Sequence, residues 1–125
     1  MSKSAISLAF ITLIKQLNDE LLKMYPEDIH FKMSKTTITM FETTNTTRQI
    51  INSLGKYLVA YNDFILTQNE KFFLNKDLSV HEEDNVLIMN KLKEYWITFT
   101  NNEKEHVWHY LENMLKLYTK LIQLK

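Results

Sequence analysis

Apolar side chains recur at intervals of three and four residues along much of this chain, which is the spacing of one face of an α-helix. The clearest case covers residues 4–24, where Ser4 is a suitable N-cap and Lys15 and Asp19 lie on the opposite side. Pro26 should end this helix, because the residue before a proline avoids the helical region. The predicted apolar face consists of Ile6, Phe10, Leu13, Leu17, Leu21 and Met24.

Residues 29–44 carry two patterns at once. Ile29, Phe31 and Met33 alternate with other residues, and several threonines follow, which favours a strand. The same segment also fits a helix, and no second strand is visible with which a first strand would pair. We therefore favour a helix, with a face made of Ile29, Met33, Thr37, Met40 and Phe41.

Two helices are predicted in the middle of the chain. Asn45 or Thr46 can cap the first, which runs to about Tyr61 and contains Gly55. Because glycine inside a helix costs about 1 kcal/mol relative to alanine, we expect another helix to pack closely over it. The apolar face of the helix that contains Gly55 consists of Ile50, Leu54, Tyr57, Leu58 and Tyr61. A second, shorter helix is predicted over residues 63–74.

The last third of the chain predicts an acidic loop at residues 75–84 and two helices. One covers residues 85–99, and the other starts after a cap at Asn101 or Asn102 and is apolar on more than one side. The residues expected to be buried in the first are Leu87, Ile88, Leu92, Tyr95, Trp96 and Phe99. The last helix has a main stripe of Val107, Leu111, Met114, Tyr118 and Leu121 and a second strip of Trp108, Leu115 and Ile122.

Composition supports a single all-α domain of five to six helices over residues 1–125. One glycine and one proline leave little material for hairpins, and 45% hydrophobic residues suffice for a core. A net charge of zero argues against a general nucleic-acid binder or a polybasic membrane protein. The absence of cysteine excludes disulfides and thiolate metal sites. The apolar run at residues 5–14 lacks a cleavage site and is too short to span a bilayer.

Three short motifs resemble a known group of proteins. They are Tyr25-Pro26 after the first helix, the stretch Glu70 to Phe73, and the Trp-x-Tyr-Leu motif from Trp108 to Leu111. With the order of segments over most of the chain, they resemble small uncharacterised proteins of giant nucleocytoplasmic DNA viruses of the mimivirus and algal-virus type. The resemblance implies a viral, intracellular, helical protein and carries over no catalytic residue.

The nearest approach to a chemical site is the pair His106 and His109, with Glu103, Glu105 and Glu112 on the same helix. Two imidazoles and a carboxylate can hold zinc, but the His-Glu-x-x-His spacing is missing and one helix rarely completes a site. His81 and the acidic residues beside it lack the spacing of a calcium loop. No glycine-rich phosphate loop or nucleophilic triad is visible. We therefore expect no enzyme, no metal, no cofactor and no small-molecule substrate.

Two functions remain open. The first is a non-enzymatic interaction module that binds a viral or host protein, or itself, through the last two helices, with Trp96, Trp108, Tyr110 and Tyr118 as exposed anchors. The second is a weak nucleic-acid-associated factor that uses Lys116, Lys120 and Lys125. Either would act inside a cell, in the host cytoplasm, a viral factory or a virion.

Overall fold

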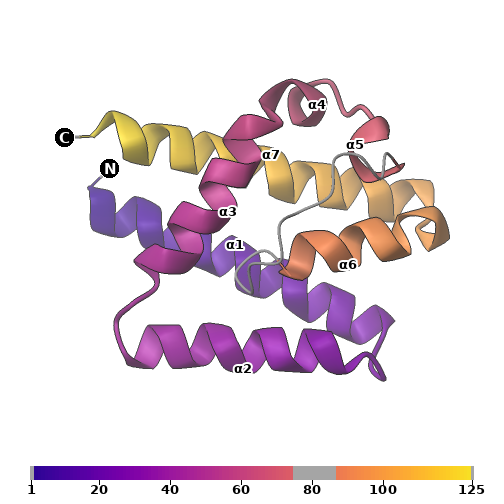
Figure 1. The fold of residues 1–125 in the computed structure, drawn as a ribbon, viewed down its shortest axis with the longest axis horizontal. Coiled ribbons are helices and arrows are strands. Elements are labelled where there is room, and N and C mark those ends of the chain that lie inside the picture. The colour runs from indigo at the N-terminus through magenta and orange to yellow at the C-terminus, as the bar shows by residue number, and fades with distance from the viewer. Residues whose placement is uncertain (1, 75–86, 125) are drawn as a thin grey trace.

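The computed structural model describes residues 2–74 and 87–124, which fold into α-helices and one short 3-10 turn, with no strand among them (Figure 1). The all-α prediction is therefore confirmed, including the helix expected near residues 29–44. The acidic loop at residues 75–84 with His81, and also Lys125, lie outside the described residues. The elements are α1 Lys3–Met24, α2 Ile29–Thr43, α3 Arg48–Ala60, α4 Asn62–Leu66, α5 Lys71–Leu74, α6 Leu87–Tyr95, η3 Trp96–Thr98 and α7 Asn101–Gln123.

The two longest helices, α1 and α7, run antiparallel side by side through the centre of the molecule, so that the N- and C-terminal ends of the chain lie at the same end (Figure 1). The rings of Phe10 on α1 and Tyr118 on α7 lie 6.4 Å apart at that end. Helix α2 covers one side of α1, and α3 crosses α7 on the side nearest the viewer in Figure 1. The apolar stripes expected for α1 and α7 thus form one shared core.

Gly55 on α3 lies directly against the ring of Tyr118 on α7. A methyl group built at Gly55 would overlap three carbons of that ring. This confirms that another helix packs closely over the glycine, and it explains why a residue unfavourable for helices stands inside α3. The crossing of α3 over α7 therefore depends on the missing side chain.

The buried face of helix α2 differs from the predicted one. Its buried side chains are Phe31 and Ile38, whereas Ile29, Met33 and Met40 of the predicted face point to solvent.

The other two residues of the predicted face, Thr37 and Phe41, are half-buried, and Phe41 packs against the core. The position of Phe31 is reinforced by Asn18 of α1, a buried side chain whose amide donates to the Phe31 carbonyl at 3.0 Å. The prediction for α2 is therefore wrong for the three residues that form its outer face.

Several helix ends differ from the prediction because another polar residue has the better geometry. Ser2, not Ser4, caps α1 by accepting from the Ala5 amide. Thr100, not Asn101 or Asn102, caps α7, and its reciprocal bonds with Glu103 form a capping box.

The helix boundaries in the middle of the chain also differ from the prediction. Asn45 has a φ of 59° and ends α2 instead of capping α3, whose N-cap position is Thr47. The helix predicted over residues 63–74 is divided into α4 and α5, because Gln68 adopts a φ of 50° between them. This division raises the number of helices above the five to six expected.

We expect Gly55→Ala to lower the free energy of unfolding, although alanine favours a helix by about 1 kcal/mol. Overlap with the Tyr118 ring should outweigh that gain and give a net loss of about 1–2 kcal/mol in urea unfolding. In a Tyr118→Leu background the same substitution should be neutral or stabilising, since the ring is gone. An equal loss in both backgrounds would contradict the close approach.

Candidate functional site

Three of the four aromatic rings expected to anchor a partner are core residues. Trp96 is 0% exposed, Trp108 4% and Tyr118 5%. The expectation that they form an exposed surface is wrong, because these rings fill the space between helices. Only Tyr110 remains partly exposed.

The packing around Trp96 shows why it is unavailable to a partner. Its ring stacks on Phe73 at 3.9 Å and meets Trp108 edge-on at 5.4 Å. Its indole N–H donates to Glu70 at 3.3 Å, and Lys104 pairs with the same carboxylate at 3.0 Å. Both the ring of Trp96 and its indole N–H therefore have partners within the fold.

The remaining predicted residues lie on the outer side of α7. His106 and His109 are both exposed, and no group of three metal-binding side chains is found within residues 2–74 and 87–124. Lys116 and Lys120 are also exposed. The structure brings His106, but not His109, to the edge of a groove.

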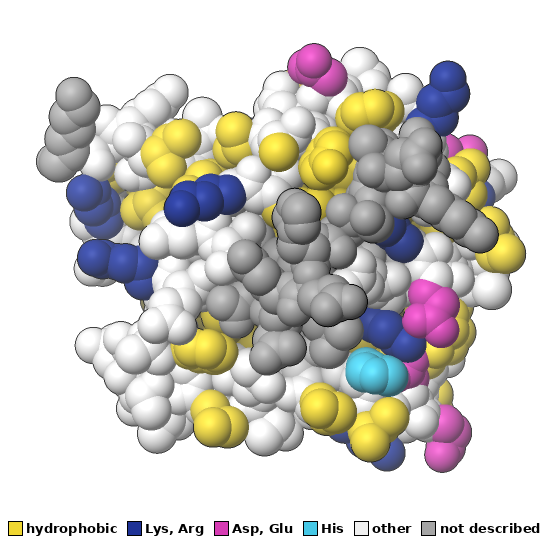
Figure 2. Space-filling view, viewed as in Figure 1, with side chains coloured by type: hydrophobic (Ala, Val, Ile, Leu, Met, Phe, Trp, Pro, Cys, Tyr) yellow, Lys and Arg dark blue, Asp and Glu magenta, His cyan; other side chains and the backbone are white. Residues whose placement is uncertain are grey.

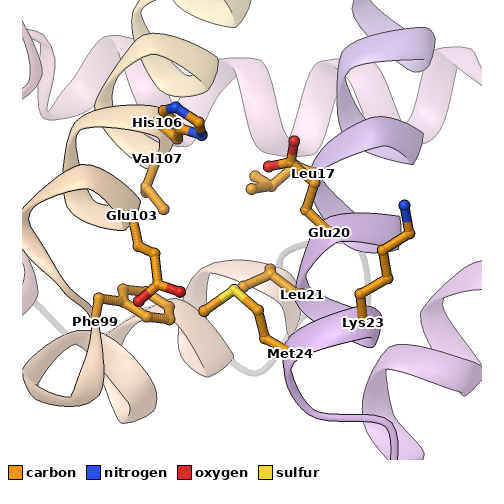
Figure 3. A pocket seen from close by; sticks show the side chains of 9 residues that line it. All are labelled: Leu17, Glu20, Leu21, Lys23, Met24, Phe99, Glu103, His106 and Val107. Carbon is orange, nitrogen blue, oxygen red and sulfur yellow. The ribbon is translucent and has the colours of Figure 1, made fainter.

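This groove has a volume of about 360 Å³ and lies between the C-terminal half of α1 and the start of α7 (Figure 3). Its apolar surface comes from both helices, and its polar groups stand at the rim. The apolar side chains are Leu17, Leu21, Met24, Phe99 and Val107, and the polar ones are Glu20, Lys23, Glu103 and His106.

The groove lies where α1 and α7 are further apart than at their contact near Phe10 and Tyr118 (Figure 1). Leu17 and Leu21 are almost fully buried, as is Val107, so they form a firm floor. Met24 is half-buried at the end of α1 and supplies the flexible part of the wall. An apolar surface with a few charged groups around it is typical of a binding site.

Two carboxylates, those of Glu20 and Glu103, stand on opposite walls of the groove (Figure 3). Glu103 is held in place by the capping box, in which its carboxylate accepts the Thr100 N–H at 2.8 Å. Burial raises the pKa of the Tyr110 hydroxyl, and the charge of Glu20, to which this hydroxyl donates, raises it further. Lys23 extends along α1, away from the α7 wall, so the lining holds two carboxylates and one ammonium group besides the imidazole of His106.

A second polar cluster lies outside the groove and joins α2 to α6. The Asp28 carboxylate, 7% exposed, accepts from Lys91 at 2.9 Å, from the Tyr95 hydroxyl and from the His30 backbone at 2.9 Å. Lys91 also pairs with Glu94 at 2.7 Å.

The electrostatics of this cluster favour the ionised pair. Burial alone would raise the pKa of Asp28, but the hydrogen bonds from Tyr95, Lys91 and His30 hold it well below its usual range. Burial opposes the charge on Lys91, but bonds to Glu94 and Asp28 raise its pKa above the ordinary value. Every charged group of the cluster is paired, so we interpret it as structural.

Comparisons with known proteins yield no relative. The chain matches no protein-family model, and no curated protein and no solved structure is significantly similar to it. In the described part of the chain, no helix combines the length and the hydropathy needed to cross a bilayer.

We expect Asp28→Asn to lower the free energy of unfolding at pH 7 by roughly 2–3 kcal/mol, because it leaves the buried Lys91 without one partner. The folded pKa of Asp28 lies below its unfolded value of about 3.9. Its stabilisation is therefore complete above that pH and decreases as the pH falls toward the folded pKa. The difference between wild type and Asp28→Asn should shrink below pH 4 in urea unfolding.

Asp19→Asn is the matched control, since Asp19 pairs with Lys35 at 3.5 Å and its side chain is 49% exposed. The free energy of unfolding of Asp19→Asn should be lower than that of wild type by less than about 1 kcal/mol. Equal losses for the two variants at pH 7, or a difference between wild type and Asp28→Asn that is as large at pH 2.5 as at pH 7, would contradict the assignment.

Proposed function

We propose that this protein is a non-enzymatic helical interaction module that receives an apolar segment of a protein partner in the groove between α1 and α7. The observation that carries the proposal is the groove itself, in which apolar side chains of α1 and α7 lie between the carboxylates of Glu20 and Glu103 on opposite walls. The proposed binding surface still includes the C-terminal helix α7, but it is the groove and not the surface expected around Trp96 and Trp108, which are buried. The lack of cysteine and the resemblance to proteins of giant DNA viruses support an intracellular setting.

The chemistry of the lining supports binding rather than catalysis. Its polar groups are two glutamates, one lysine and one histidine, and the lining contains no serine, threonine or cysteine nucleophile. Glu103 is already committed to the capping box. A partner that places apolar side chains on the floor and a basic side chain between Glu20 and Glu103 fits these groups best.

A pair of designed peptides tests this function. One is an amphipathic helix of leucine and lysine, and the other has the same leucines with glutamate in place of lysine. The basic peptide should bind and the acidic one should not, because the walls of the groove carry Glu20 and Glu103. Isothermal titration calorimetry at low salt measures both affinities.

Met24→Lys should weaken the basic peptide at least tenfold, since it places a charge on the apolar wall and repels the lysines of the peptide. Leu66→Lys is the matched control, because Leu66 is 52% exposed on α4 and does not line the groove. Equal affinity for Met24→Lys and wild type, or equal binding of both peptides, would overturn the proposed groove.

A second candidate function is weak binding of nucleic acid along the outer face of α7. Lys116 and Lys120 are exposed one turn apart, and neither pairs with an acidic side chain in the described ranges. Phosphates attract such lysines, and binding through them falls steeply with salt. The net charge of zero makes this function the weaker of the two.

For this second function, the double variant Lys116→Gln, Lys120→Gln should bind a fluorescent single-stranded DNA oligonucleotide at least fivefold more weakly at low salt. The slope of log K against log salt should become shallower by about 1–2, because two phosphate contacts are lost. The double variant Lys56→Gln, Lys71→Gln removes the same charge from α3 and α5 and serves as control. An equal loss in both double variants, or no binding by wild type, would exclude α7 as a nucleic-acid surface.

A further inference from the structure

Helix α2 has an unpartnered apolar stripe on its outer face. Ile29 is 61% exposed, Met33 53% and Met40 61%. Figure 2 shows hydrophobic side chains in a row along the lower edge of the molecule, where Figure 1 places α2. Spacings of four and seven residues put the three on one side of the helix, opposite Phe31 and Ile38, which hold α2 on the core.

The polar residues beside this stripe give it a positive edge. Lys32 is exposed next to Met33. The charged groups further round the helix are already paired with α1, since Glu42 pairs with Lys15 at 3.3 Å and Lys35 with Asp19 at 3.5 Å. No acidic side chain of α2 therefore accompanies Lys32 along the outer stripe.

We propose that the outer stripe of α2 in one copy of the chain occupies the α1–α7 groove of a second copy. The two surfaces are complementary, because the stripe is apolar with Lys32 at its edge and the groove is apolar with Glu20 and Glu103 on its walls. This inference rests on the proposed function of the groove and names its occupant. Methionine and isoleucine are suited to such a contact, since they adapt to an irregular apolar surface.

One molecule cannot make this contact with itself. Helix α2 packs on α1 on the side of Lys15 and Asp19. The groove lies on another side of α1, bordered by Leu17, Glu20 and Leu21. The contact is therefore intermolecular and joins two different surfaces, and each added copy leaves one stripe and one groove free.

The alternative within the same chain is a symmetric pairing of two α2 stripes. That pairing provides no acidic residue to meet Lys32, whereas the groove provides two. Charge complementarity therefore favours the contact between stripe and groove. A single helix of 15 residues, about 22 Å long, covers less than a standard interface. Self-association should accordingly be weak and visible only at high protein concentration.

Two variants separate these arrangements in sedimentation-velocity experiments on the full chain. Met33→Glu disables the stripe, because it faces Glu20 and Glu103, and Met24→Lys disables the groove, because it faces Lys32. Circular dichroism checks that both variants remain folded. The average mass of wild type should rise with concentration past that of a dimer. Each variant alone should associate at least tenfold more weakly.

The decisive sample is an equimolar mixture of the two variants. The intact stripe of Met24→Lys should enter the intact groove of Met33→Glu, giving a one-to-one heterodimer that grows no further. Lys32→Glu should weaken self-association of wild type, and addition of Glu20→Lys to it should restore association. Val59→Glu, on α3 at a residue 41% exposed, is the control that leaves association unchanged.

Three outcomes would overturn the inference. Self-association that Met24→Lys leaves intact would indicate symmetric pairing of α2, and a mixture that forms no heterodimer would exclude the stripe–groove contact. Wild type that stays monomeric at the highest concentration, while the basic peptide still binds the groove, would refute the second copy as occupant and leave the proposed function standing. If the basic peptide also fails to bind, the proposed function falls with it.

Discussion

The packing of α7 against α1 is the interaction on which the rest of the fold depends, because α2, α3 and α4 pack directly on one or both of these helices. Phe73 of α5 contacts Trp108 of α7, and α6 is attached through α2 and α5. Near Phe10 and Tyr118 the pair is close and fully packed, and α3 crosses there because Gly55 leaves room for the Tyr118 ring. Toward the other end, where α7 begins, the two helices diverge and the groove opens. The closely packed contact at one end and the groove at the other therefore both follow from the way in which α1 and α7 lie against each other.

The polar cluster around Asp28 plays a different part, since it sets the position of α2. Asp28 caps α2 and at the same time holds Lys91 and Tyr95 of α6. The ring of Tyr25, just after α1, stacks on Tyr95 at 3.9 Å. The start of α2 is therefore attached to both α1 and α6, although α2 buries only two apolar side chains. The polar cluster therefore adds to the attachment of a helix that has only a small apolar contact with the core.

The sequence alone is sufficient for the class of fold and for most of the core, because helical periodicity records which side chains are buried. Leu17, Leu21 and Val107 were assigned to core stripes, and their burial confirms this. Periodicity does not record the distance between two packed helices, so the groove and the role of Glu20 had no visible signal. The buried tryptophans show the same limit, since a helix apolar on two sides gives Trp96 and Trp108 the same pattern whether a neighbouring helix or a partner covers them.

The two patterns of α2 follow from its two apolar faces. A helix that buries one face shows a single period, whereas α2 has Phe31 and Ile38 facing inward and Ile29, Met33 and Met40 facing outward. Superposed, the two sets produce the alternation at residues 29, 31 and 33 that resembles a strand. The inner set packs on the core, and the outer set is exposed to solvent. The outer set is the surface that the proposed contact with a second copy would cover, and it is also what makes the sequence pattern of α2 ambiguous.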